Sequence, residues 1–124
     1  MRFVCLCHID AELIGKLSPS ELEHFDRENR DADAVLIKSG HYVSALALAD
    51  AATAVMVRRR EGKLSATDGP YAETKEQLGG ILIIEARDLA EAIEIAQAGP
   101  MADVGTVEVR PELDVAWQRE QQGR

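Results

Sequence analysis

The apolar run Ile81-Leu82-Ile83-Ile84 constrains the fold of this chain more than any other segment. Successive side chains of a β-strand point to opposite faces, so a strand that is apolar at every position is expected to be buried on both faces. Gly79 and Gly80 open this run. We therefore expect residues 81–84 to form a strand of a sheet that is covered on both sides.

Two amphipathic helices are predicted. The first begins at Ser18, whose hydroxyl can cap it, with a proline at the first helical position and a glutamate that completes a capping box. It ends at Gly40, a residue typical of helix C-termini. The second helix begins after Asp88, which can cap it in the same way, and ends at Gly99.

Short extended segments surround these helices, and we expect strands over residues 2–8, 41–48, 54–60, 63–67, 81–84 and 106–110. Glu61-Gly62 is typical of a tight turn and pairs residues 54–60 with 63–67 as a hairpin. This order of elements predicts a ferredoxin-like α+β fold, βαββαβ, with an added hairpin.

The predicted sheet has more apolar surface than one chain can cover. Two helices cover one face, and the other face carries part of residues 81–84 and one side of the first strand. A soluble monomer rarely exposes an apolar surface of that size. We predict a homodimer whose sheets pack face to face, which corresponds to a dimeric α+β barrel.

Composition excludes several classes of partner. The net charge is -8, and the one basic run, residues 58–60, is followed by a glutamate, so no nucleic-acid partner is expected. No segment approaches the roughly 20 apolar residues that cross a membrane, and the first residues do not form a signal peptide. We expect a cytoplasmic protein with reduced thiols at Cys5 and Cys7, and no metal site, because two thiols and His8 lack a further soft ligand.

The most unusual segment is 67–80, which places three carboxylates, an ammonium group and a phenol between two strands. Two interpretations stay open. Asp68 can hydrogen-bond the backbone of its own turn, so that the segment shapes the fold. Alternatively, Glu73 and Lys75 act as acid and base or hold a ligand beneath this loop, with Tyr71 as a wall.

The histidines add further candidates. His8 ends the first strand two residues before Asp10, whose carboxylate can orient it, and His41 opens the second strand. A structural or surface role is the alternative for both of them, and for His24. The candidate catalytic residues are His8, Asp10, Glu73 and Lys75, and the candidate ligand-binding residues are Asp68, Tyr71, Glu73, Lys75 and His41.

Residues 68–80, Asp-Gly-Pro-Tyr-Ala-Glu-Thr-Lys-Glu-Gln-Leu-Gly-Gly, closely resemble the signature of the DGPF branch of YCII-related proteins, in which Tyr71 is commonly a phenylalanine. Residues 17–19, 39–41 and 105–111 agree with it, so the resemblance covers roughly residues 1–111. It leaves 112–124 as a tail that either is flexible or docks on a neighbour through Val115 and Trp117. It implies a dimeric α+β barrel that works without a bound cofactor.

The resemblance does not supply an activity. Some members of the family lie beside extracytoplasmic-function sigma factors, or are fused to them, which implies a regulatory link. Some relatives carry a His/Asp pair, with one residue in the first helix and the other in an Asp-Pro just after the second helix. In this chain His24 lies near that position of the first helix but not on it, and Gly99-Pro100 stands where the Asp-Pro would be. The sequence therefore favours a homodimer that binds a small molecule or acts as a cofactor-independent enzyme, with a non-catalytic interaction or regulatory module as the alternative.

Overall fold

The computed structural model describes residues 1–121 and 123, without the side chains of Trp117 and Gln118. Packing of the Trp117 side chain on a neighbour, one role open to the tail, lies outside the described residues. The tail does contain a short helix, α4 (Ala116–Gln121). Within the described part of the chain, no helix has the length and apolar content needed to cross a membrane.

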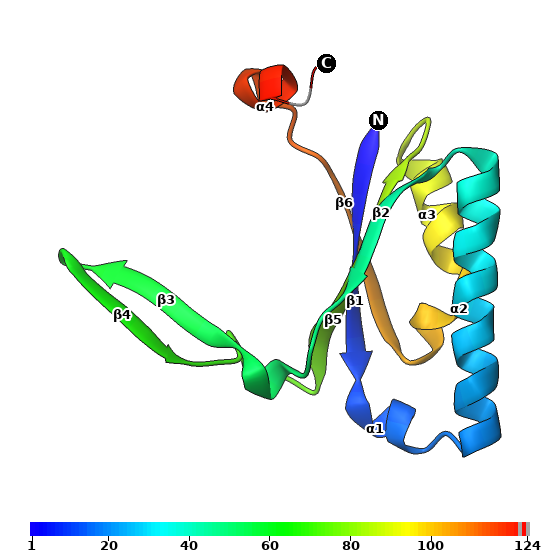
Figure 1. Cartoon of the computed structure of the whole chain (residues 1–124), viewed down its shortest axis with the longest axis horizontal. Coiled ribbons are helices and arrows are strands. Elements are labelled where there is room, and N and C mark those ends of the chain that lie inside the picture. The colour runs from blue at the N-terminus through cyan, green and yellow to red at the C-terminus, as the bar shows by residue number, and fades with distance from the viewer. Residues whose placement is uncertain (122, 124) are drawn as a thin grey trace.

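A central antiparallel sheet forms the core of the fold (Figure 1). Its strands lie in the order β2-β5-β1-β6. Their bounds are β1 Arg2–Asp10, β2 Tyr42–Ala47, β5 Glu76–Glu85 and β6 Gly105–Pro111. A separate hairpin of β3 (Val55–Arg60) and β4 (Lys63–Asp68), here called the hairpin arm, stands away from this sheet. The predicted ferredoxin-like α+β fold with an added hairpin is confirmed.

Helices α2 (Pro19–Ser39) and α3 (Leu89–Ala98) lie on the same face of the sheet (Figure 1). Both begin at the predicted caps. The Ser18 hydroxyl accepts a hydrogen bond from the backbone N–H of Glu21 at 3.2 Å, and the Glu21 carboxylate accepts one from the Ser18 N–H at 3.0 Å. Asp88 caps α3 through the N–H of Glu91. The C-cap of α2 is Gly40 in the left-handed conformation, φ 81°.

The sequence did not predict the short helices, which are α1 (Ala11–Gly15), η1 (Ala51–Thr53), η2 (Pro100–Asp103) and α4. Helix α1 follows β1 directly. The Asp10 carboxylate, with the residue only 5% exposed, accepts a hydrogen bond from the Glu12 N–H at 3.0 Å and so caps it. A single turn of helix is too short to give a hydrophobic period, which is why only its capping residue marks it in the sequence.

The hydrophobic core lies between the sheet and the two helices. Phe3 and Cys5 of β1 and Ile84 of β5 are at most 1% exposed, and Ala92 of α3 packs against them. Within residues 81–84 only Ile84 is fully buried. The helices cover one face of this run only, so burial of its other face, which we expect from a second copy of the chain, stays a prediction.

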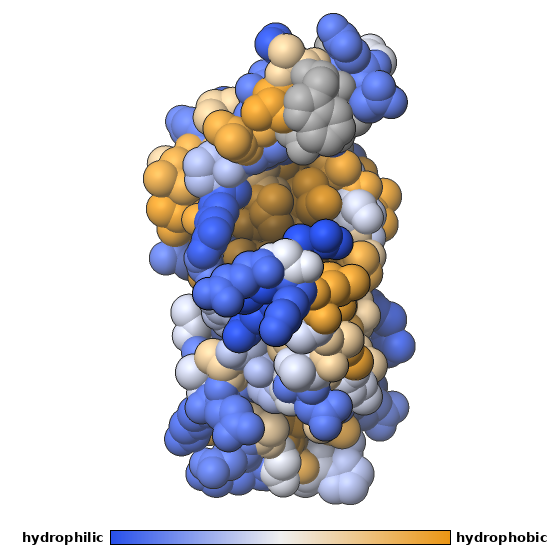
Figure 2. All heavy atoms as spheres, turned by 90° about the vertical axis from the view of Figure 1, so that its left-hand side faces the viewer, coloured by the Kyte–Doolittle hydropathy of each residue, from blue (hydrophilic) through white to orange (hydrophobic). Residues whose placement is uncertain are grey.

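The opposite side of the sheet, here called the uncovered face, is apolar. Strand alternation and the pairing of β1 with β5 place Val4, Leu6, Ile81 and Ile83 on it, and Leu46 of β2, which pairs with Ile81, is 54% exposed. Figure 2 shows this side as a hydrophobic hollow between the hairpin arm and the C-terminal segment. This is the surface from which the sequence predicts a homodimer.

Candidate functional site

A groove of about 900 Å³ lies between α2, α3 and the helix-facing side of the sheet, here called the α2 groove. Its volume falls within the range of roughly 300–1,000 Å³ typical of small-molecule sites. Helix α2 has no fully buried residue along its whole length, so it stands off the sheet and leaves this space open. Most of the lining is apolar and includes Ile9, Phe25, Ala32, Leu36, Leu82 and Ile95.

Two glycines form part of the floor of the α2 groove. Gly79 is the extra residue of a β-bulge, where the pairing of β1 with β5 shifts between Cys7 and His8. A Cβ atom at Gly79 would lie 2.5 Å from Cδ1 of Ile9, so the Ile9 side chain would have to move to make room for any larger residue. The Gly79-Gly80 pair therefore allows the close backbone approach that this part of the floor needs, and both residues line the groove.

Asp33 and Cys7 bring ionisable groups into the α2 groove from opposite sides, α2 and β1. Burial raises the pKa of the Asp33 carboxyl above its ordinary value of 3.8, because the ionised form is poorly hydrated there. Burial, and then the charge of Asp33, raises the pKa of the Cys7 thiol. A carboxyl of this kind in an apolar groove is a candidate proton donor or acceptor.

Asp33 is not among the residues predicted from the sequence. A signal for it exists, because Asp33 lies four residues after Asn29 and eight after Phe25, which puts it on the side of α2 that faces the sheet. The same helix carries many carboxylates that face solvent. Asp33 therefore cannot be distinguished from them until the packing of the helix is known.

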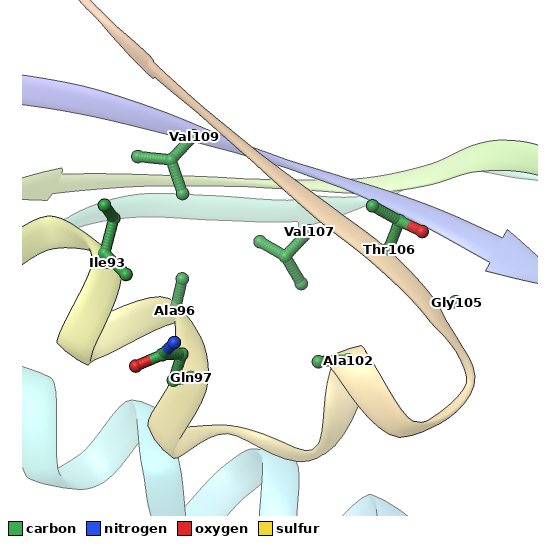
Figure 3. A pocket seen from close by; sticks show the side chains of 8 residues that line it. All are labelled: Ile93, Ala96, Gln97, Ala102, Gly105, Thr106, Val107 and Val109. Carbon is green, nitrogen blue, oxygen red and sulfur yellow. The ribbon is translucent and has the colours of Figure 1, made fainter.

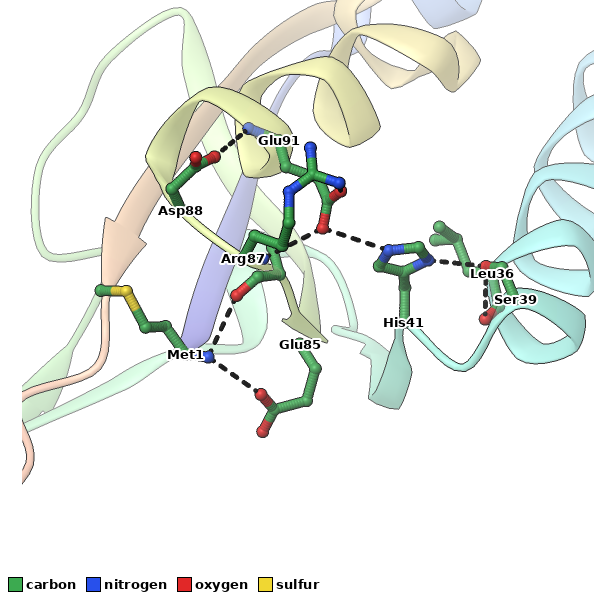
Figure 4. A network of polar contacts seen from close by, with 9 residues as sticks. Met1, Leu36, Ser39, His41, Glu85, Arg87, Asp88 and Glu91 are labelled. Atoms are coloured by element: carbon green, nitrogen blue, oxygen red, sulfur yellow. Dashed lines mark hydrogen bonds and ion pairs between the residues drawn. The ribbon is translucent and has the colours of Figure 1, made fainter.

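A polar network closes one end of the α2 groove, where His41 connects α2 to α3 (Figure 4). The Nδ1 atom of His41 lies 2.7 Å from the Ser39 hydroxyl, and its Nε2 atom lies 3.2 Å from Oε1 of Glu91. The backbone N–H of Arg87 donates to Glu91, and this bond, together with the Arg87 guanidinium, holds the Glu91 pKa below its ordinary value. Ser39 and His41 both line the groove, so the candidate ligand-binding residue His41 does lie at a cavity.

His8 has a different partner from the one suggested by the sequence. Its Nε2 atom donates to Oε1 of Glu108 at 2.9 Å, and not to the nearby Asp10. Strand β6 pairs with β1 and brings Glu108, 100 residues away, to the same face. The bond from His8, and then the one from Arg110, lowers the pKa of Glu108. His8 therefore belongs to the uncovered face and not to the α2 groove.

The structure brings together two of the predicted residues, Asp10 and Lys75. The Lys75 ammonium lies 3.6 Å from Oδ2 of Asp10 and 3.5 Å from Oε2 of Glu12. The charge of Asp10, followed by that of Glu12, raises the pKa of Lys75. Lys75 is largely exposed and does not line the α2 groove, so this ion pair ties the loop before β5 to the start of α1.

The other predicted ligand-binding residues of the loop lie at the surface. Asp68 ends β4, Glu73 is exposed, and Tyr71 is 80% exposed. The side-chain amide of Gln77 donates to the Ala72 carbonyl at 2.7 Å, so this loop is held by bonds of its own. Of residues 68–80, only Gly79 and Gly80 line the α2 groove.

A second depression, of about 450 Å³, lies between α3, η2 and β6 (Figure 3). Its polar lining consists of Gln97 and Thr106, and no ionisable side chain of the described residues reaches it. It therefore offers less chemistry than the α2 groove. Within residues 1–121 and 123, no three His, Cys, Asp or Glu side chains gather in a group that could hold a metal ion.

A family model, the YCII-related domain, matches residues 1–115. The chain belongs to the YCII-related family. The family resemblance seen in the sequence is thus confirmed, while its DGPF branch stays a prediction. A curated relative, an uncharacterized protein of Rhizobium meliloti (strain 1021), is 30% identical over 113 residues, which are 90% of this chain and 91% of the relative.

Among solved structures, the chain is similar to 5-chloro-2-hydroxyhydroquinone dehydrochlorinase (TftG) from Burkholderia phenoliruptrix AC1100, in complex with 2,5-dihydroxybenzoquinone. The TM-score is 0.47 and the sequence identity 14%, over 93% of this chain and 96% of the other. A likeness of this degree carries no information about what this YCII-related protein binds.

Proposed function

We propose that this YCII-related protein is a homodimer that binds a small, largely apolar molecule in the α2 groove. The observation that carries the proposal is a cavity of about 900 Å³ with apolar walls and one poorly hydrated carboxyl, Asp33. Small-molecule sites typically combine an apolar enclosure with a few polar groups that fix orientation. Groups with shifted pKa values concentrate at such sites.

The chemistry of the lining restricts the ligand. An ionised Asp33 accepts hydrogen bonds and repels anions, so the ligand bears a hydroxyl or amine group opposite it, on an apolar ring or chain. His41 and Ser39 offer further hydrogen-bonding groups at one end of the groove. If the ligand is converted, Asp33 is the group placed to take its proton, because a raised pKa strengthens a carboxylate as a base.

The homodimer and the ligand site use opposite sides of the sheet. The uncovered face carries Val4, Leu6 and Ile83, none of which lines the groove under α2 and α3. Face-to-face packing of two copies would therefore cover the apolar side chains and leave both grooves open to ligand.

The experiment is a calorimetric titration with neutral cyclic fragments that bear one hydroxyl or amine group. Asp33→Asn is compared with Asp31→Asn, which removes a carboxylate from the exposed side of the same helix. We expect Asp33→Asn to weaken binding about tenfold or more, since a hydrogen bond to a charged group contributes about 1.5–3 kcal/mol. Asp31→Asn should bind as the wild type does.

Variants of the loop residues Glu73 and Lys75 test the alternative site, the one that the sequence predicts beneath the loop. Glu73→Ala and Lys75→Ala should leave fragment binding unchanged, because neither side chain lines the α2 groove. Weaker binding in these variants, with Asp33→Asn unaffected, would move the site to the loop. Absence of fragment binding, together with recovery of a protein partner, would favour the interaction or regulatory module and the sigma-factor link.

A further inference from the structure

The hairpin arm is amphipathic. Cross-strand partners share a face, so the pairing of β3 with β4 places Val55, Val57 and Leu64 on one side, together with Ala66 and the charged ends of Arg59 and Asp68. Each of these three side chains is 63–65% exposed. The opposite side carries Met56 at the base of the arm and is otherwise polar and basic, with Arg58, Arg60, Lys63, Ser65 and Thr67. A sheet with one apolar face normally packs that face against something.

The arm is locally well formed. Glu61 and Gly62 both have positive φ, 53° and 75°, as the tight turn that matches the twist of a hairpin requires. At its base the Gly69 N–H donates to the Ala54 carbonyl at 2.8 Å. A two-stranded hairpin is marginal on its own, however, so the apolar side of the arm needs a surface to cover.

The position of the arm indicates which surface that is. It projects on the side of the sheet away from the helices (Figure 1) and borders the hydrophobic hollow (Figure 2). Six residues per strand give it a length of roughly 20 Å. Packed sheets lie only about 10 Å apart, so the arm is long enough to pass alongside a second sheet seated on the uncovered face.

Charge favours a second copy of this chain as the occupant. Residues 55–68 carry four basic and two acidic side chains, whereas the rest of the chain carries ten basic and twenty acidic ones. The body of each copy is therefore strongly acidic and the arm is basic. An arm that reaches across to another copy gains from this complementarity, whereas two bodies without arms repel each other.

We propose that the hairpin arm of each copy lies against the second copy and covers part of its surface with Val55, Val57 and Leu64. The two arms are exchanged symmetrically about the twofold axis. This inference rests on the homodimer proposed above. It is independent of what the α2 groove binds, because the arm does not line that groove.

The test measures the dimer dissociation constant by sedimentation equilibrium. Val57→Glu and Leu64→Glu place a carboxylate on the apolar side of the arm, and Ser65→Glu places the same charge on the opposite side. We expect each of the first two variants to raise the dissociation constant at least about tenfold, and Ser65→Glu to change it much less. Leu6→Glu, on the uncovered face itself, should give a monomer.

Three outcomes decide the inference, and far-UV circular dichroism verifies that each variant is folded. The arm is supported if Val57→Glu and Leu64→Glu weaken the dimer and Ser65→Glu does not. The arm contact is overturned, and the homodimer is kept, if Val57→Glu, Leu64→Glu and Ser65→Glu have the same dimer dissociation constant while Leu6→Glu is monomeric. A wild-type chain that is monomeric at micromolar concentration overturns both the arm and the homodimer, and fragment titration still decides the ligand site separately.

Discussion

Gly105, the first residue of β6, should be unusually intolerant of substitution. It pairs with Ile9 of β1, and a Cβ atom built on it would lie 1.9 Å from the carbonyl oxygen of His8 and 2.9 Å from its carbonyl carbon. Real Cβ atoms essentially never approach other atoms below 3.0 Å, so the two strands would have to separate by more than an ångström. The obstacle is backbone and not a flexible side chain, so relaxation is costly.

We expect Gly105→Ala to lower the free energy of unfolding by about 4 kcal/mol or more, as other backbone clashes within a core do. For a chain of this length that corresponds to a fall in Tm of roughly 12 °C or more, measured by thermal unfolding. Gly99→Ala is the matched control, because φ there is -90° and nothing lies within 4 Å of the added Cβ. A Gly105→Ala protein that melts within about 3 °C of the wild type would show that β1 and β6 accept the added methyl group without separating.

Three further predictions concern capping, acid stability and thiol reactivity. Ser18→Ala removes the hydroxyl that accepts the hydrogen bond from the Glu21 N–H and should cost about 1 kcal/mol in chemical denaturation, and an unchanged midpoint would contradict this. Folding lowers the pKa values of Glu91 and Glu108 below their ordinary value of 4.5. Both carboxylates therefore stabilise the protein at pH values above 4.5, and this stabilisation is lost as the pH falls through their lowered pKa values. Denaturation at pH 3–6 should show that slope, and Glu91→Gln should flatten it. Burial raises the pKa of Cys5 to about 11 and also raises that of Cys7. At pH 8 both thiols should therefore react with iodoacetamide more slowly than free cysteine does. Equal rates would show that the two thiols are not buried.

The elements of the fold were predictable because local chemistry specifies them. Ser18 and Asp88 mark helix starts by their capping bonds, and Glu61-Gly62 marks the hairpin turn by its backbone preference. These signals lie within a few residues of the element they define. They do not require knowledge of the tertiary structure, and so the order of strands and helices follows from them.

The site was less predictable because it depends on packing between distant segments. The α2 groove exists because α2 stands off the sheet, and that distance leaves no periodic mark in the sequence. Asp33 resembles its exposed neighbours until the helix is placed. For His8, sequence proximity suggested Asp10, but β6 supplies Glu108 instead and Asp10 caps α1.

The candidate residues of the loop show the same limit. Their density of charge made 68–80 conspicuous, yet charge density does not distinguish a ligand site from a solvated loop. Asp10 and Lys75 were both identified as candidates, and they do meet in the structure. What the sequence did not reveal is that this contact lies outside the α2 groove.

The most direct test of the ligand site is a map of backbone amide chemical shifts during titration with a neutral hydroxyl-bearing cyclic fragment. We predict that shifts concentrate at residues that line the α2 groove, including Cys7, Asp33, Gly80 and Leu82. Shifts confined to the loop of residues 69–75 or to the hairpin arm, with the groove silent, would contradict the account.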